Sequence, residues 1–205
     1  GWIDLAKRWG HDYVVMGPYK DNYPVVITSK FPLTAIQRLA GDEETEVSHG
    51  AVHVSVTPVE GFPVHIVNLH LKPDTDDQAA KYRLSEIEYY MSKTINSPEY
   101  YQNLNWLMTG DFNSDEDTVP YKIILKSGFI GDTMNAVQNP ENAEYFSMSR
   151  YKPMDTVKKS GRHIDHVFYT PNSVKVLSWK LITDSYDGKF GSDHLPIVVD
   201  WRLAK

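Results

Sequence analysis

Short apolar runs with the two-residue period of β-strands recur along most of this chain of 205 residues. In the clearest run, residues 51–59, Val52, Val54 and Val56 alternate with polar side chains. Side chains of a strand point to alternate faces of a sheet, so this pattern predicts a half-buried strand. The other strands are expected at residues 12–17, 24–30, 32–40, 62–73, 104–110, 163–170, 174–182 and 196–203.

One long segment has helical periodicity instead, with its apolar side chains on a single face. The residues that form this face are Ala80, Leu84, Ile87, Met91 and Ile95. Thr75 followed by Gln78 predicts a capping box at the start of this helix. Shorter helices are expected over residues 2–9 and 118–128, whereas the polar residues 131–161 are expected to form a long surface loop.

Many short strands with few helices between them predict a single mixed α/β domain over residues 1–205, with two packed sheets and helices outside them. The net charge of −6 argues against a protein that holds duplex nucleic acid mainly through its phosphates. The chain has no cysteine, which excludes disulfides and thiolate metal sites, and no transmembrane segment is expected. The sequence does not indicate a compartment.

Four polar clusters lie within the predicted strands or at their ends: NLHL (68–71), GDFNS (110–114), HIDH (163–166) and SDHLP (192–196). Taken singly, each has a structural explanation, because Asp and Asn favour turns and a strand histidine is often a hydrogen-bonded core residue. Together they supply carboxylates for a hard cation, an amide for a phosphate and imidazoles for proton transfer. The candidate site residues are His70, Asp111, Asn113, Asp165, Asp193 and His194.

Two of these residues, Asp165 and His194, form a candidate pair, since a carboxylate fixes the tautomer of an imidazole and raises its basicity. Asp193 is next to His194 on a Gly-Ser loop directly before an apolar strand. Neighbours inside a strand face opposite ways, but at its mouth the backbone is still turning and both can serve one pocket.

The motifs TGDFNS, RHIDHVFY and GSDHLPIVVDW, preceded by VNLHL, resemble those of the endonuclease/exonuclease/phosphatase superfamily. The resemblance spans roughly residues 12–202. It implies a deoxyribonuclease-like four-layer αββα sandwich of two packed, mainly antiparallel sheets. It also implies a Mg²⁺-dependent phosphoesterase, with Mn²⁺ as a second possible cofactor.

The resemblance assigns a role to each candidate residue. Asp111 would position or activate the attacking water, or protonate the leaving oxygen, and would share the metal site with Asp193. Asn113 would hydrogen-bond the scissile phosphate. His194, oriented by Asp165, would contact the phosphate and stabilise the pentacoordinate transition state. His70 matches the strand histidine that acts as a general acid or phosphate contact in some members.

The sequence departs from the family in one respect. Members use an N-terminal strand that ends in Asn and a Glu that is the principal Mg²⁺ ligand, and neither precedes GWIDLAKRWG. We therefore expect an N-terminally incomplete domain with a depleted metal site and exposed core edges. Glu43, Glu44 or Glu46 could replace the missing ligand, but the acidic segment 41–50 is interpreted as a solvated loop.

The substrate is less constrained than the chemistry. Cations near residues 150–162 could bind further phosphates or lie in a solvated loop: Arg150, Lys152, Lys158, Lys159 and Arg162. Aromatic side chains in the same segment could stack on a base or pin the loop to the domain: Tyr145, Phe146 and Tyr151. The leading interpretation is a phosphomonoesterase or phosphodiesterase acting on a small molecule, a lipid head group or a nucleic acid. The alternatives are a deoxyribonuclease-like endonuclease and a non-catalytic binding domain that keeps the fold; protein partners are not indicated.

Overall fold

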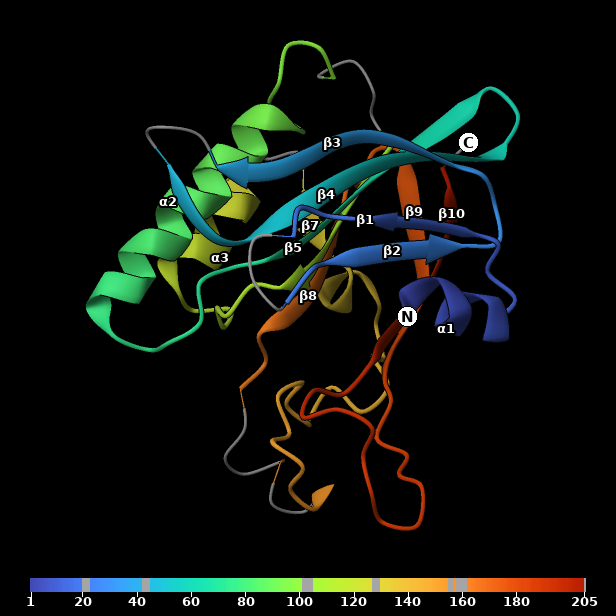
Figure 1. Cartoon of the computed structure of the whole chain (residues 1–205). Coiled ribbons are helices and arrows are strands. Elements are labelled where there is room, and N and C mark those ends of the chain that lie inside the picture. The colour runs from blue at the N-terminus through green and yellow to red at the C-terminus, as the bar shows by residue number, and fades with distance from the viewer. Residues whose placement is uncertain are drawn as a thin grey trace. The chain divides into compact units, whose positions relative to one another are not determined.

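The computed structural model describes residues 1–19, 23–41, 45–100, 105–126, 130–154, 157 and 162–204. The chain forms two compact units, Gly1–Asn113 and Ser114–Lys205 (Figure 1). The single domain expected over residues 1–205 stays a prediction. No helix among the described residues is long and apolar enough to cross a membrane.

The first unit contains a sheet in which β3 (Leu33–Gly41), β4 (Glu46–Val59), β5 (Phe62–His70) and β6 (Trp106–Asp111) follow one another. The first three strands are antiparallel neighbours, whereas β5 and β6 run parallel. The outer pair β1 (Tyr13–Met16) and β2 (Val26–Ser29) is antiparallel and follows helix α1 (Trp2–Arg8). The strands and the opening helix predicted for this part of the chain are confirmed.

Strand β4 is buried on both faces, not on one face as its alternating pattern predicted. On one face Val52 and Val54 pack against Val15 and Val25 of the β1–β2 region. On the other face the imidazole of His53 is fully buried. His53 therefore belongs to the core, where a polar side chain needs a hydrogen-bond partner inside the protein.

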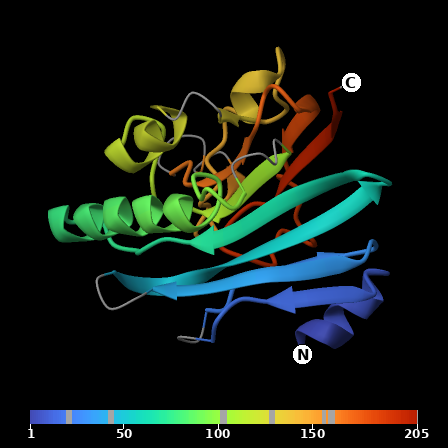
Figure 2. The same ribbon diagram turned by 90° about the horizontal axis from the view of Figure 1, so that it is seen from above.

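Helix α2 (Asp77–Lys93) connects β5 to β6 and packs against β4 and β3 (Figures 1 and 2). Its cap is Asp76, whose carboxylate accepts a hydrogen bond from the N–H of Ala79 at 2.8 Å, so the predicted capping box is wrong. An aspartate at this position satisfies a free N–H and also places negative charge at the positive end of the helix. Because parallel strands end at the same edge, the crossover brings the last residues of β5 and β6 together.

The second unit contains α3 (Val119–Lys126), the antiparallel pair β7 (Gly131–Asp132) and β8 (Asp165–Tyr169), and the antiparallel pair β9 (Val174–Leu181) and β10 (Ile197–Leu203). The helix and the three strands expected here at 118–128 and beyond residue 162 are confirmed. Their core holds Trp179, Leu181 and Leu195.

Two sequence-based expectations about loops are wrong. Strand β4 begins at Glu46, so the acidic segment 41–50 is not a loop throughout. The segment 131–161 contains β7 and the short helix Met134–Ala136, and its Ser147 and Ser149 are buried. Its aromatic residues Tyr145 and Phe146 pack against the core, whereas Tyr151 is exposed.

Candidate active site

His70 and Asp111 are the last residues of β5 and β6 and are register partners in the parallel pair. The Nε2 atom of His70 lies 3.4 Å from Oδ2 of Asp111. The other oxygen, Oδ1, accepts a hydrogen bond from the N–H of Asn113 at 2.8 Å. Three of the predicted residues are therefore neighbours at one edge of the first unit.

The GDFN motif is built for this close approach. A Cβ on Gly110 would lie 1.9 Å from the carbonyl oxygen of Leu69, so only glycine lets β6 run this close to β5. Asn113 has a φ of 47°, a left-handed conformation that asparagine tolerates better than most residues. Its amide donates to the carbonyl of Leu71 at 3.1 Å, which fixes the orientation of the buried side chain.

A further imidazole, that of His49 on β4, lies against His70 and was not predicted. The centroids of the His49 and His70 rings are 4.1 Å apart. The ring of Tyr23 makes a T-shaped contact with His49, with 5.5 Å between the centroids. His49 is almost fully buried. No period or motif distinguishes it in the sequence, because its position beside His70 depends on how β4 and β5 pair.

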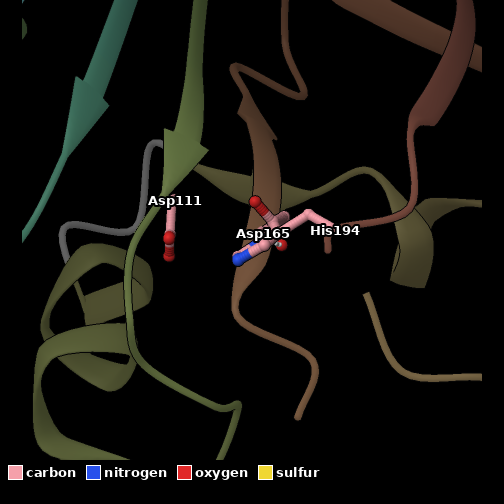
Figure 3. A group of neighbouring side chains, drawn as sticks. All are labelled: Asp111, Asp165 and His194. Atoms are coloured by element: carbon pink, nitrogen blue, oxygen red, sulfur yellow. Dashed lines mark hydrogen bonds and ion pairs between the residues drawn. The ribbon is translucent and has the colours of Figure 1, made fainter. Parts of the chain in front are cut away.

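The second unit holds the predicted acid–histidine pair. Asp165 is the first residue of β8, and His194 lies in the loop before β10. The Nδ1 atom of His194 lies 2.7 Å from Oδ2 of Asp165, and both side chains are about three-quarters buried (Figure 3). A carboxylate on Nδ1 holds the proton there, so Nε2 is left for a ligand. Figure 3 also shows Asp111 at the end of β6.

Asp193 is half-buried, and among the described residues its carboxylate has no hydrogen-bond partner. Carboxylate oxygens of Asp193 and Asp111 are ligands of the type that Mg²⁺ takes in proteins. Glu43 and Glu44 lie outside the described residues, and the side chain of Glu46 is not described, so these proposed ligands stay untested.

The two histidines of the HIDH motif, His163 and His166, are buried. His166 contacts the carboxylate of Asp132 at 3.1 Å through Nδ1 and the carbonyl of Ser114 at 2.9 Å through Nε2. Burial alone would lower the pKa of His166, but the hydrogen bond and charge of Asp132 outweigh it and raise this pKa. Burial, followed by the charge of His166, lowers the pKa of His163 to about 4.

The cations near residues 150–162 have different surroundings in the described part of the chain. Arg162 is paired with Asp115, with 3.1 Å between Nε and Oδ2. Arg150 and Lys152 are exposed, and Lys158 and Lys159 lie outside the described residues. The predicted phosphate-binding role of these cations stays a prediction.

Comparisons with known proteins give one family. The model of the Endonuclease/Exonuclease/phosphatase family matches residues 1–194. No curated protein sequence matches the chain.

Solved structures of the same fold are similar over nearly the whole chain. A functionally unknown conserved protein from Enterococcus faecalis V583 has 18% sequence identity and a TM-score of 0.70, with 94% of this chain and 77% of that one covered. The mannosyl-6-phosphatase Bt3783 of Bacteroides thetaiotaomicron has 17% sequence identity and a TM-score of 0.66, with 93% of this chain and 76% of that one covered. The catalytic domain of human Nocturnin, solved with a bound sulfate anion, has 17% sequence identity and a TM-score of 0.68, with 99% of this chain and 76% of that one covered. These likenesses confirm the predicted mixed α/β, deoxyribonuclease-like fold class.

Proposed function

The chain belongs to the endonuclease/exonuclease/phosphatase family, and from this premise we propose that it is a metal-dependent phosphoesterase. The reaction would be hydrolysis of a phosphomonoester or a phosphodiester by a water molecule. The observation that carries the proposal is the hydrogen-bonded pair of Asp165 and His194, at 2.7 Å. Such a pair holds an imidazole in one tautomer, with Nε2 directed at a substrate.

In the proposed mechanism His194 contacts the scissile phosphate through Nε2. With both nitrogens protonated, it donates one hydrogen bond to Asp165 and a second to a phosphate oxygen, where negative charge grows in the transition state. A preorganised donor of this kind contributes about 2.7–4 kcal/mol to lowering the barrier. Asp165 keeps the ring in place and stabilises its positive charge.

The residues at the edge of the first unit would act on the water and on the leaving group. Asp111 would orient the attacking water and accept its proton, or protonate the leaving oxygen. The nearby His70 would serve as general acid or phosphate contact. The amide of Asn113, fixed by Leu71, would donate to a phosphate oxygen.

Mg²⁺ is the proposed cofactor, and Mn²⁺ would serve in its place. The carboxylates of Asp111 and Asp193 fit a hard cation that takes few protein oxygens and keeps several waters. When bound, the ion would supply positive charge to the phosphate, which a chain of net charge −6 otherwise offers sparingly. This charge also favours a small or lipid-like phosphate ester over duplex DNA as substrate.

The test is a substrate panel measured with Mg²⁺ and with a chelator: p-nitrophenyl phosphate, bis-p-nitrophenyl phosphate, an inositol phosphate and plasmid DNA. The expected result is hydrolysis of a small ester that the chelator stops. Asp111→Asn should abolish it, whereas Asp200→Asn, an exposed aspartate on β10, should not. Plasmid nicking that depends on Asp111 would establish the endonuclease instead. Turnover in chelator would contradict the metal dependence, and no turnover of any substrate would favour a binding domain.

A further inference from the structure

The segment from Ser147 to Tyr151 lies between the two stretches that carry the acid–histidine pair. Met148 forms one antiparallel bridge with Arg162 and another with His194. Met148 therefore joins the approach to Asp165 on one side to the loop of His194 on the other. The sequence predicts a surface loop here, because nothing in its local pattern indicates that Ser147 and Ser149 are buried.

Ser147 is fully buried, and its hydroxyl and carbonyl are bonded to both sides. The Oγ atom accepts hydrogen bonds from the N–H groups of Ile164, at 3.0 Å, and Asp165, at 3.1 Å. The carbonyl accepts the N–H of Leu195 at 2.7 Å. One serine thus fixes the backbone of the acid and the backbone next to the histidine.

Ser149, also buried, fixes the peptide that joins Asp193 to His194. The carbonyl oxygen of Asp193 accepts three hydrogen bonds, from Ser149 N at 2.8 Å, Arg150 N at 2.8 Å and Ser149 Oγ at 2.9 Å. A carbonyl held by three donors cannot rotate, so the directions of the two flanking side chains are set together.

The backbone of this segment is in a sparsely populated conformation at two successive residues. Arg150 and Tyr151 have φ values of 52° and 59°, although neither is glycine. Left-handed conformations at such residues cost on the order of 1 kcal/mol each and persist where the surroundings impose them. Here the turn directs the successive N–H groups of Ser149 and Arg150 to one carbonyl, and Tyr151 N donates to Ser149 Oγ at 3.3 Å.

We infer that Ser147 and Ser149 are positioning residues for the acid–histidine pair. Their buried hydroxyls hold Asp165, Asp193 and His194 in one arrangement without touching the substrate. The expected effect on kcat rests on the proposed role of His194, whereas the expected effect on the geometry of the pair does not. This positioning explains how the neighbours Asp193 and His194 can both belong to the site, because the hydrogen-bonded peptide between them orients both side chains.

The test compares Ser147→Ala and Ser149→Ala with the matched control Ser173→Ala. Ser173 is another nearly buried serine of the same unit, which bonds Thr170 at 2.8 Å beyond the far end of β8. The first readout is the proton NMR resonance of His194 Nδ1–H, which a short hydrogen bond to a carboxylate shifts downfield. We expect this resonance in the wild type and in Ser173→Ala, and its loss in the two test variants.

The second readout is the split between kcat and KM on p-nitrophenyl phosphate with Mg²⁺. Because small misplacements of catalytic groups cost up to about a hundredfold, we expect kcat to fall about tenfold to a hundredfold with KM nearly unchanged. Ser147→Thr and Ser149→Thr keep the hydroxyl and should restore both readouts. If Ser147→Ala does not fold, the Ser149 variants decide.

The two proposals fail in different ways. A wild-type chain that hydrolyses no substrate but loses the His194 resonance in the alanine variants would overturn the proposed function and support the positioning role. Alanine variants that keep the resonance, or whose kcat stays within twofold of Ser173→Ala, would overturn the positioning role.

Discussion

At the scale of single residues, the histidines of this chain differ by their partners. His194 and His166 each contact a carboxylate, that of Asp165 and that of Asp132. His53 is fully buried and is bonded to a second imidazole, that of His65, at 2.8 Å. A carboxylate favours the charged imidazole, whereas burial without one disfavours it. The two environments therefore predict opposite responses of stability to pH.

The pair of His53 and His65 should make the protein sensitive to acid. Burial, followed by the charge of His65, lowers the pKa of His53 to about 4, against about 6.5 in an unfolded chain. Between these values the unfolded state binds more protons, so the free energy of unfolding falls as the pH falls from 6.5 towards 4. The loss is on the order of 3 kcal/mol, and it is absent above pH 6.5.

Urea unfolding at pH 8, 7, 6 and 5 measures the part of this loss that occurs above pH 5, about 2 kcal/mol. His53→Gln cannot titrate and should show a flatter profile than the wild type below pH 6.5. His11→Gln, a change at a half-buried histidine of the same unit, should follow the wild type. Parallel profiles for wild type and His53→Gln would contradict the prediction.

Asp165→Asn should separate catalysis from binding. An amide at this position carries no negative charge, so it would no longer stabilise the doubly protonated imidazole of His194 that donates to the phosphate in the proposed mechanism. Catalysis in acid–histidine sites then falls by several powers of ten, so we expect kcat to drop at least about a hundredfold with KM little changed. Steady-state kinetics on p-nitrophenyl phosphate measure both constants, with Asp200→Asn as control. An Asp165→Asn enzyme with kcat close to the wild type would remove His194 from the proposed mechanism.

At the scale of elements, the crossover from β5 through α2 to β6 determines the edge where His70 and Asp111 meet. Glu86 of α2 is buried and joins the start of this connection to the neighbouring strand β4. Its carboxylate accepts hydrogen bonds from Ser48 N at 2.7 Å and Ser48 Oγ at 2.8 Å, before β4 enters the core. It also accepts Lys72 N at 2.7 Å, two residues after β5 ends.

Glu86→Ala should therefore destabilise the fold strongly. The change leaves the partly buried N–H groups of Ser48 and Lys72 without their acceptor, which costs about 3 kcal/mol in the free energy of unfolding. Glu88→Ala, an exposed change on the same helix, should stay within about 0.5 kcal/mol of the wild type. Urea unfolding compares the two. Equal stabilities would show that Glu86 does not hold the connection.

The periodic elements could be predicted from the sequence, and the parts that depend on tertiary contacts could not. The strand and helix periods of residues 51–59, 62–73 and 80–95 are local properties, so they located β4, β5 and α2. Ser147 and Ser149 are buried only because distant backbone groups need their hydroxyls, and no local pattern records this.

The candidate site divides in the same way. Motifs with chemically distinctive residues, such as GDFN and SDHLP, could be found in the sequence. The contact of His49 with His70 depends on strand pairing and could not. Within HIDH, strand alternation separates the face of Asp165 from that of His166, but the contacts of His166 with Asp132 and Ser114 join residues far apart in the sequence and could not be predicted.

At the scale of the whole molecule, the charge of −6 and the family's chemistry give complementary constraints. An acidic chain binds a phosphate ester poorly unless positive charge is supplied locally, and a bound cation supplies it. The carboxylates that repel the substrate in the absence of metal would then be the groups that hold the metal. Cation binding and substrate binding should accordingly depend on the same aspartates.

Magnesium should therefore stabilise the folded chain, and this stabilisation should require Asp111 and Asp193. A ligand that binds only the native state adds about 2.7 kcal/mol to the free energy of unfolding at a hundred times its Kd. We expect Tm to rise with Mg²⁺ concentration in the wild type and in Asp200→Asn, and the increment to be lost in Asp111→Asn and Asp193→Asn. Calorimetry in Mg²⁺ and in chelator measures it without any substrate. Because each variant is compared with itself in the two buffers, a change in its intrinsic stability does not affect the result. An equal Mg²⁺ increment in all four proteins would place the cation elsewhere and remove both aspartates from the proposed metal site.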